Sequence, residues 1–125
     1  MKIKEAIIEP AMSHLLHLCR RELELDELPP ITLIHDKPFI QSGDQKSFGE
    51  FSNNSIKIIT LSRHPMDVMR SLAHELSHWK QHLKNQEMDG SDGSETENQA
   101  NSLAGIIMRK FAQKYPDYFI DSLPS

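Results

Sequence analysis

Apolar residues recur at intervals of three or four in three stretches of the chain, a spacing that places them on one face of a helix. These stretches predict helices over about Pro10–Leu25, Pro65–Leu83 and Glu95–Lys114. In the first helix we expect Pro10 in the first turn, where the N–H that proline lacks has no partner within the helix. Pro116 ends the last helix, since proline cannot continue one.

Between the first two helices the pattern changes to short β-branched runs. Ile31–Asp36 predicts a strand, and Lys37–Lys46, with a proline, a glycine and an aspartate, predicts a loop. Ser47–Ser52 and Ile56–Leu61 flank the turn signal Asn53–Asn54 and predict a hairpin. The order of helix, three strands and two helices indicates an α+β fold, in which a small antiparallel or mixed sheet packs on helices.

Length and composition limit the class of protein. A chain of 125 residues without an internal repeat or linker predicts one domain over residues 1–125. Hydrophobic residues make up 38% and charged residues 26%, which is ordinary for a globular fold. The polar stretch Asn85–Gly93 interrupts the helical pattern, and we expect it to be mobile.

Charge and cysteine content exclude several functions. The net charge of -4 lacks the basic excess that nucleic-acid binding requires, so we expect no nucleic-acid partner. No apolar run is long enough for a signal core or a membrane span, so we expect no membrane association. The single cysteine, Cys19, has no partner for an internal disulfide, which favours a reducing, cytoplasmic location.

The second predicted helix contains the sequence His-Glu-Leu-Ser-His at positions 74–78, which matches the H-E-x-x-H pattern. His74 and His78 lie one turn apart, opposite the apolar stripe of that helix, so both imidazoles can reach one metal ion. Glu75 lies one step around the helix, where it can hold a water. The alternative is that the two histidines simply belong to a solvated helix face.

A zinc site with two histidines needs a third protein ligand. Glu97 lies 19 positions after His78 on the next predicted helix, and Asn101 follows one turn later, where it can accept the ring N–H of His74. Small Ala100 and Ala104 allow the two helices to approach closely. Glu97 also fits a capping box with Ser94, and Glu95 is a second candidate ligand.

The combination of HELSH with ENQANSLAG resembles the gluzincin metallopeptidases, and in particular their small members of the ImmA/IrrE type from phages and mobile elements. The similarity covers about Glu50–Phe111. It implies a minimal zincin-like fold with an N-terminal helix, a small three-stranded sheet, an active-site helix and a glutamate helix. It also implies Zn²⁺ as cofactor, held by His74, His78 and Glu97, with Glu75 as the general base.

The sequence therefore predicts a zinc metallopeptidase, most simply an endopeptidase, that hydrolyses peptide bonds in a protein or peptide through a zinc-activated water. The alternative is a non-catalytic, zinc-stabilised protein that binds a partner on a peptidase-like fold. A group to stabilise the oxyanion is left open among His35, His64, Tyr115 and Tyr118.

Two further expectations concern the edges of the site. We expect substrate to add as a strand along Phe48, Gly49, Glu50, Phe51 and Ser52, because an extended peptide satisfies its backbone groups at a free sheet edge. The tail Tyr115–Ser125 has two interpretations. It either offers an oxygen ligand to zinc and keeps the enzyme latent, or it covers the core beneath the first helix.

Overall fold

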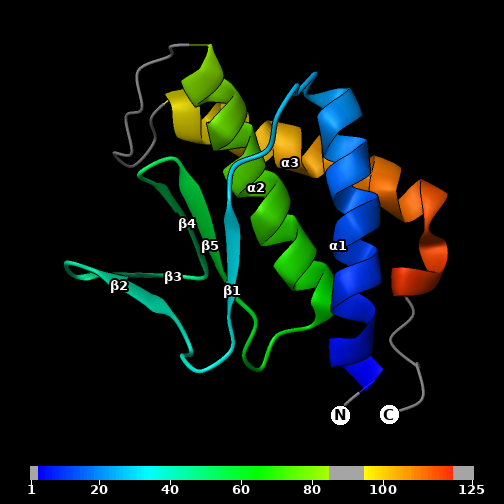
Figure 1. Cartoon of the computed structure of the whole chain (residues 1–125), viewed down its shortest axis with the longest axis horizontal. Coiled ribbons are helices and arrows are strands. Elements are labelled where there is room, and N and C mark those ends of the chain that lie inside the picture. Colours follow the sequence, from blue (N-terminus) through cyan, green and yellow to red (C-terminus); the bar gives the residue numbers. More distant parts are fainter. Residues whose placement is uncertain (1–2, 85–94, 120–125) are drawn as a thin grey trace.

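The computed structural model describes residues 3–84 and 95–119 of the chain, and its fold is α+β (Figure 1). The expected break at Asn85–Gly93 and the expected cap Ser94 lie outside the described residues. In chain order the elements are α1 (Ile3–Glu22), β1 (Ile31–Ile34), β2 (Ile40–Ser42), β3 (Gln45–Ser47), β4 (Gly49–Ser52), β5 (Ser55–Ile59), α2 (Pro65–Leu83), α3 (Glu95–Lys114) and the 3₁₀ turn η1 (Pro116–Phe119).

The main sheet has three strands in the order β1-β5-β4, with β1 parallel and β4 antiparallel to β5. The expected hairpin is confirmed: Ser52 pairs with Ser55 across a two-residue turn. Asn53 and Asn54 have φ of 50° and 60°, the left-handed conformation that such turns require and that asparagine tolerates. The hairpin leaves β4 at the edge of the sheet.

The expectation of a loop over Lys37–Lys46 is wrong, because β2 and β3 form a separate two-stranded antiparallel sheet there. Gly43 takes φ of 60° and closes its turn. Five of the six residues in these two strands are exposed, so the short segments show no alternation of apolar and polar positions. Their only sequence signal is the turn itself.

The expected bounds of the first helix are also wrong at both ends. Pro10 lies inside α1 rather than in its first turn, since the helix begins at Ile3 and already places Ile8 in the core. The helix ends at Glu22, where Glu24 takes φ of 53° and Leu25 N–H donates to the Arg20 carbonyl over 2.9 Å. This is a Schellman ending, but without the glycine that normally announces it.

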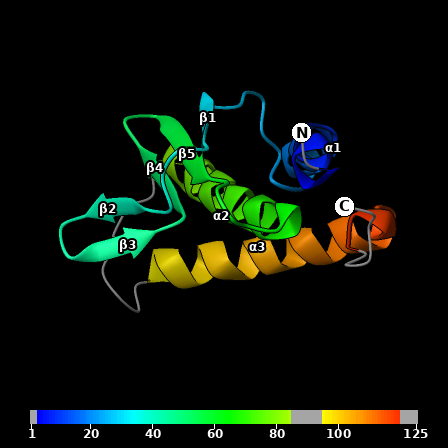
Figure 2. The ribbon, with the colours of Figure 1, turned by 90° about the horizontal axis from the view of Figure 1, so that it is seen from below.

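Helix α2 lies in the middle of the molecule, between the sheet and α3, with α1 packed beside it (Figure 2). Its apolar face, the central strand β5, and α1 and α3 enclose one hydrophobic core. The largest fully buried side chains there include Leu15, Ile56, Ile58, Met69, Leu72, Leu76, Ile107 and Phe111. Among the described residues, no helix combines the length and the hydropathy that crossing a bilayer requires.

Candidate metal centre

The start of α2 is fixed by local capping, which sets the direction of the helix that carries the H-E-x-x-H sequence. His64 is the N-cap, and its Nδ1 accepts a hydrogen bond from Met66 N–H over 3.0 Å. Pro65 follows in the first turn, as the sequence predicts. His64 therefore has a structural role in starting the helix, and it does not line the cleft described below.

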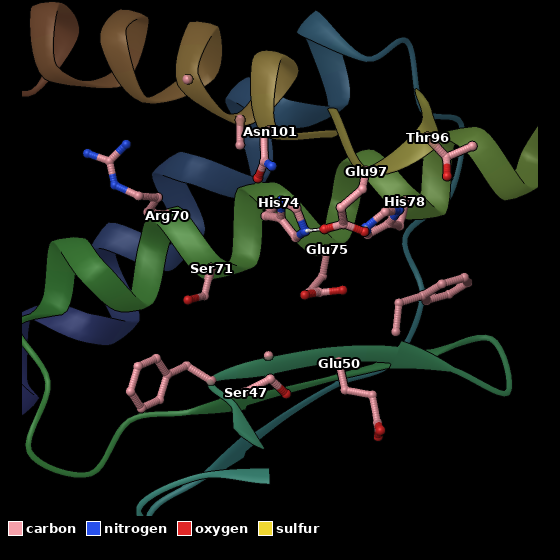
Figure 3. Close-up of a pocket in the computed structure, with 15 residues that line it drawn as sticks. Ser47, Glu50, Arg70, Ser71, His74, Glu75, His78, Thr96, Glu97 and Asn101 are labelled. Atoms are coloured by element: carbon pink, nitrogen blue, oxygen red, sulfur yellow. Dashed lines mark ion pairs between the residues drawn. The ribbon is translucent and has the colours of Figure 1, made fainter. Parts of the chain in front are cut away.

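Three side chains converge between α2 and α3 (Figure 3). Glu97 Oε1 lies 2.8 Å from His74 Nε2, and Glu97 Oε2 lies 3.2 Å from His78 Nε2. One ligand atom from each residue lies within 4.8 Å of the others, so the group can hold a metal ion. Tetrahedral ligands about 2.1 Å from zinc stand about 3.4 Å apart, and two imidazoles with a carboxylate are a typical zinc donor set. The residues therefore fit the ion.

Helix α3 covers the histidine face of α2, so the alternative of a solvated helix face is wrong for His78, which is only 8% exposed. Ala100 and Ala104 are both buried in this region, as the predicted close approach of the helices requires. The Glu97 carboxylate contacts both imidazoles, one with each of its two oxygens. For the rival Glu95, the side chain lies outside the described part of the structure.

Asn101 makes the predicted contact with His74, a hydrogen bond between the two side chains. Burial, followed by the neighbouring His78, lowers the pKa of His74, while Glu97 and the Asn101 hydrogen bond oppose the shift. The net effect favours neutral imidazole, which is the form that binds a metal.

Gln81 is a site residue that the sequence reasoning missed. It is 2% exposed, and its Oε1 lies 2.9 Å from His78 Nδ1. Its Nε2 donates to the Thr96 carbonyl and to Gln99 Oε1, both over 2.8 Å. These two acceptors fix the orientation of the amide, so Oε1 must accept from His78 Nδ1–H. The Nε2 atom of His78 then carries its lone pair on the side of Glu97, where it could bind a metal ion.

The signal for Gln81 was present in the spacing. It lies three positions after His78, which is the separation that brings side chains together on a helix. It also lies seven positions after His74, so it shares the face of the helix that carries both histidines. A buried amide needs partners for all its polar atoms, and the nearest candidate was the second histidine.

Glu75 points away from α3 and toward the sheet (Figure 3). It is 8% exposed, and burial, followed by the charges of Glu97 and Glu50, raises its pKa to about 8. A β-carbon placed on Gly49 would stand 3.1 Å from Glu75 Oε2 and 3.1 Å from Ile58 Cδ1. The strand can therefore lie this close to the carboxylate because position 49 has no side chain.

An open cleft of about 730 Å³ runs over these groups, with α2 as its floor and β4 and α3 as its walls. Four of the five predicted edge-strand residues line it, Phe48, Gly49, Glu50 and Phe51, whereas Ser52 does not. Ile59 N–H donates to the Phe48 carbonyl over 2.8 Å, so in this register the backbone groups of Gly49 and Phe51 point away from β5 and toward the free edge.

The remaining candidates for stabilising the oxyanion lie outside the cleft. His35 Nδ1 lies 2.6 Å from Thr60 Oγ1, and neither His35 nor the two tyrosines lines the cleft. Tyr115 stacks on His14 with 4.4 Å between ring centroids, and Tyr118 Oη lies 2.9 Å from His14 Nδ1. This part of the tail covers the core beside α1, as its second interpretation predicts. Residues 120–125 lie outside the described part.

Comparisons of the chain with protein-family models, with curated proteins and with solved structures found no match.

Proposed function

We propose that this protein is a zinc-dependent peptidase with a zincin-like fold, and that it hydrolyses peptide bonds in proteins or peptides. The observation that carries the proposal is an arrangement within one cleft. A buried carboxylate, Glu75, lies between three residues that can hold a metal ion and a strand edge with free backbone groups.

His74, His78 and Glu97 would hold the ion. When bound, zinc supplies Lewis acidity, which lowers the pKa of water and polarises a carbonyl group. Gln81 and Asn101 hold the two imidazoles by hydrogen bonds, so little reorganisation of the ligands is needed on binding.

Glu75 is the general base. Its carboxylate accepts a proton from water as the water oxygen attacks the peptide carbonyl carbon. It then returns the proton to the leaving nitrogen as the C–N bond breaks, which leaves a carboxylic acid and an amine. The raised pKa of Glu75 in the metal-free protein shows that its site disfavours an uncompensated negative charge. A nearby cation would stabilise the carboxylate and bring it into its basic form.

Substrate would lie along β4 as an added strand. Gly49 and Phe51 each offer an N–H and a carbonyl at the edge, and pairing with them presents an extended peptide to Glu75 in a fixed register. The absence of a side chain at position 49 lets β4 lie close to the Glu75 carboxylate.

The test is metal analysis of the purified protein together with cleavage assays on a broad set of protein substrates. We expect one zinc per chain and cleavage by the zinc-loaded protein. Glu75→Gln should retain zinc and lose cleavage, whereas Glu97→Ala should lose zinc. The exposed Glu9→Gln is the matched control and should change neither property.

Two results would contradict the proposal. Equal zinc retention by Glu97→Ala and wild type would remove the ligand assignment. Zinc binding without cleavage of any substrate, combined with strong destabilisation on zinc removal, would instead support the non-catalytic alternative, in which the ion only fastens α3 to α2.

A further inference from the structure

The two ends of the cleft differ in charge (Figure 3). Glu50 and Thr96 line the end toward the C-terminus of α2, and Arg70 and Ser71 line the end toward its N-terminus. Glu75 and Glu97 lie between them. Arg70 is the one cationic side chain among the residues that line the cleft in the described part of the chain.

The Arg70 guanidinium is available to a ligand. The residue is exposed, and in residues 3–84 and 95–119 its side chain has no hydrogen bond or ion pair. The neighbouring Arg63 is different. It donates to the carbonyls of Ile59 and Asp67 over 2.9 and 2.8 Å, and its guanidinium also lies 4.5 Å from the ring centroid of Phe48. Arg63 therefore supports the structure, while Arg70 has no such task.

Ser71 adds a neutral donor at the same end. Its Oγ accepts a hydrogen bond from Arg63 Nη2 over 2.7 Å, so its own hydroxyl hydrogen remains free to be donated. In Figure 3 the Ser71 side chain points across the cleft toward β4. The α3 wall of the cleft is open at Gly105, because a β-carbon on that residue would meet no atom within 4 Å.

We propose that Arg70, at the end of the cleft that Ser71 also lines, binds a carboxylate of the substrate on the C-terminal side of the cleaved bond. This inference rests on the proposed peptidase function. Antiparallel pairing is the more stable arrangement for a strand added to β4. It runs the substrate from the Phe51 end toward the Phe48 end, so the residues beyond the cleaved bond lie beside Arg70.

Planar guanidinium groups bind carboxylates through two parallel hydrogen bonds. In Figure 3 the Arg70 side chain points to the α3 side of the cleft and Ser71 to the β4 side, so Arg70 binds the carboxylate and Ser71 can donate to another polar group of the substrate. The carboxylate can belong to an aspartate or glutamate side chain, or to the free C-terminus of a short peptide. At the opposite end Glu50 disfavours an acidic residue, which makes the preference directional.

The test measures binding separately from cleavage. Fluorescent peptides that differ only in having Glu, Gln or Lys on the C-terminal side of the cleaved bond are titrated into zinc-loaded Glu75→Gln protein. A second pair compares a free with an amidated C-terminus. We expect about tenfold tighter binding of a carboxylate-bearing peptide than of its neutral partner, which corresponds to about 1.4 kcal/mol.

Variants made in the Glu75→Gln background assign the effect. Arg70→Ala should bring the ratio of the two affinities close to one, and Arg70→Glu should favour the lysine peptide. Arg109→Ala removes an exposed arginine of α3 outside the cleft and should preserve the ratio. If only the free C-terminus matters, the carboxylate is terminal. If only the glutamate matters, it is a side chain.

Equal binding of the three internal peptides together with equal binding of the two C-terminal forms, or the same preference in Arg70→Ala, would overturn the subsite. Wild-type cleavage of peptides without any carboxylate preference would overturn the subsite and leave the peptidase function intact. A carboxylate preference in binding that depends on Arg70, without cleavage by wild type, would keep the subsite and overturn the peptidase function.

Discussion

The two halves of α3 are held to the rest of the molecule by different forces. Its first turns bring Glu97 to two histidines and meet the Gln81 amide through the Thr96 carbonyl. Its later turns contribute Ala104, Ile107, Met108 and Phe111 to the hydrophobic core. One half is joined by directional polar contacts, and the other by apolar burial.

The difference predicts how each half responds to change. The stabilisation gained by burying apolar side chains does not depend on direction, and it scales with the apolar area removed from water. The polar half is different because each buried donor or acceptor needs its own partner, and removal of one leaves the other unsatisfied. The later turns should therefore determine whether α3 folds against the core, and the first turns should determine whether the metal site forms.

The largest expected effect tests the apolar half. Phe111 is fully buried and contacts Tyr115 and Tyr118, so Phe111→Ala should lower the free energy of unfolding by about 3–5 kcal/mol. Urea denaturation of the metal-free protein measures this. Ile106→Ala, at a position that is 46% exposed, is the control and should have a small effect. Equal losses for the two variants would contradict the idea that apolar burial holds the later turns of α3 to the core.

A second prediction concerns the buried carboxylate. The folded, metal-free state raises the pKa of Glu75 from 4.5 to about 8, so it binds a proton more tightly than the unfolded state does. Loss of that proton therefore lowers the free energy of unfolding. This loss of stability is absent below about pH 4.5, grows as the pH rises, and is complete above about pH 8, where it reaches roughly 3–5 kcal/mol as an upper value. Glu75→Gln should remove it.

Parallel urea denaturations of both proteins in a chelator check this sign. The glutamine variant should be more stable than wild type by a few kcal/mol at pH 8 and similar to it at pH 4. A stability difference that does not change with pH would show that the Glu75 carboxyl titrates normally in the metal-free fold.

The third prediction separates the roles of the Gln81 amide. Gln81→Leu should weaken zinc binding about 10–100-fold, because His78 loses the acceptor that fixes its tautomer. Competition with a chromophoric chelator measures the affinity. Gln99→Ala is the matched control: it removes one of the two acceptors of Gln81 Nε2 and leaves the contact with His78 in place. If both variants bind zinc equally, Gln81 only joins the helices.

The smallest effect is expected for Asn101→Ala. Asn101 is exposed and bonds to His74, which Glu97 also contacts, so zinc binding should weaken toward the lower end of the 10–100-fold range. The same chelator competition applies. Unchanged affinity would place Asn101 on the helix surface with no role in holding His74.

The sequence predicted the parts of the molecule that depend on short-range patterns. The bounds of α2 follow from Pro65 and the helical repeat, and the β4–β5 hairpin follows from Asn53–Asn54. The grouping of His74, His78 and Glu97 followed from two facts. These residue types often bind metals, and a separation of four positions places two histidines on the same face of a helix. In each case, local geometry and chemistry point to the same structure.

The features that the sequence did not predict depend on tertiary contacts or weak signals. The start of α1 before Pro10 follows from the burial of Ile8, and the exposed β2–β3 hairpin has no apolar alternation. The charge difference along the cleft arises because folding brings β4, α2 and α3 together, and no short window of sequence contains all three.

The absent side chain at Gly49 has a consequence for which substitutions the chain can accept. Alanine there would place a methyl group 3.1 Å from Glu75 Oε2, so the carboxylate or the strand would have to move by a few tenths of an ångström. A displacement of that size is tolerable for folding but significant for a group that must meet a proton at a defined point. In a library selected only for expression, position 49 should accept alanine, whereas selection for activity should return glycine.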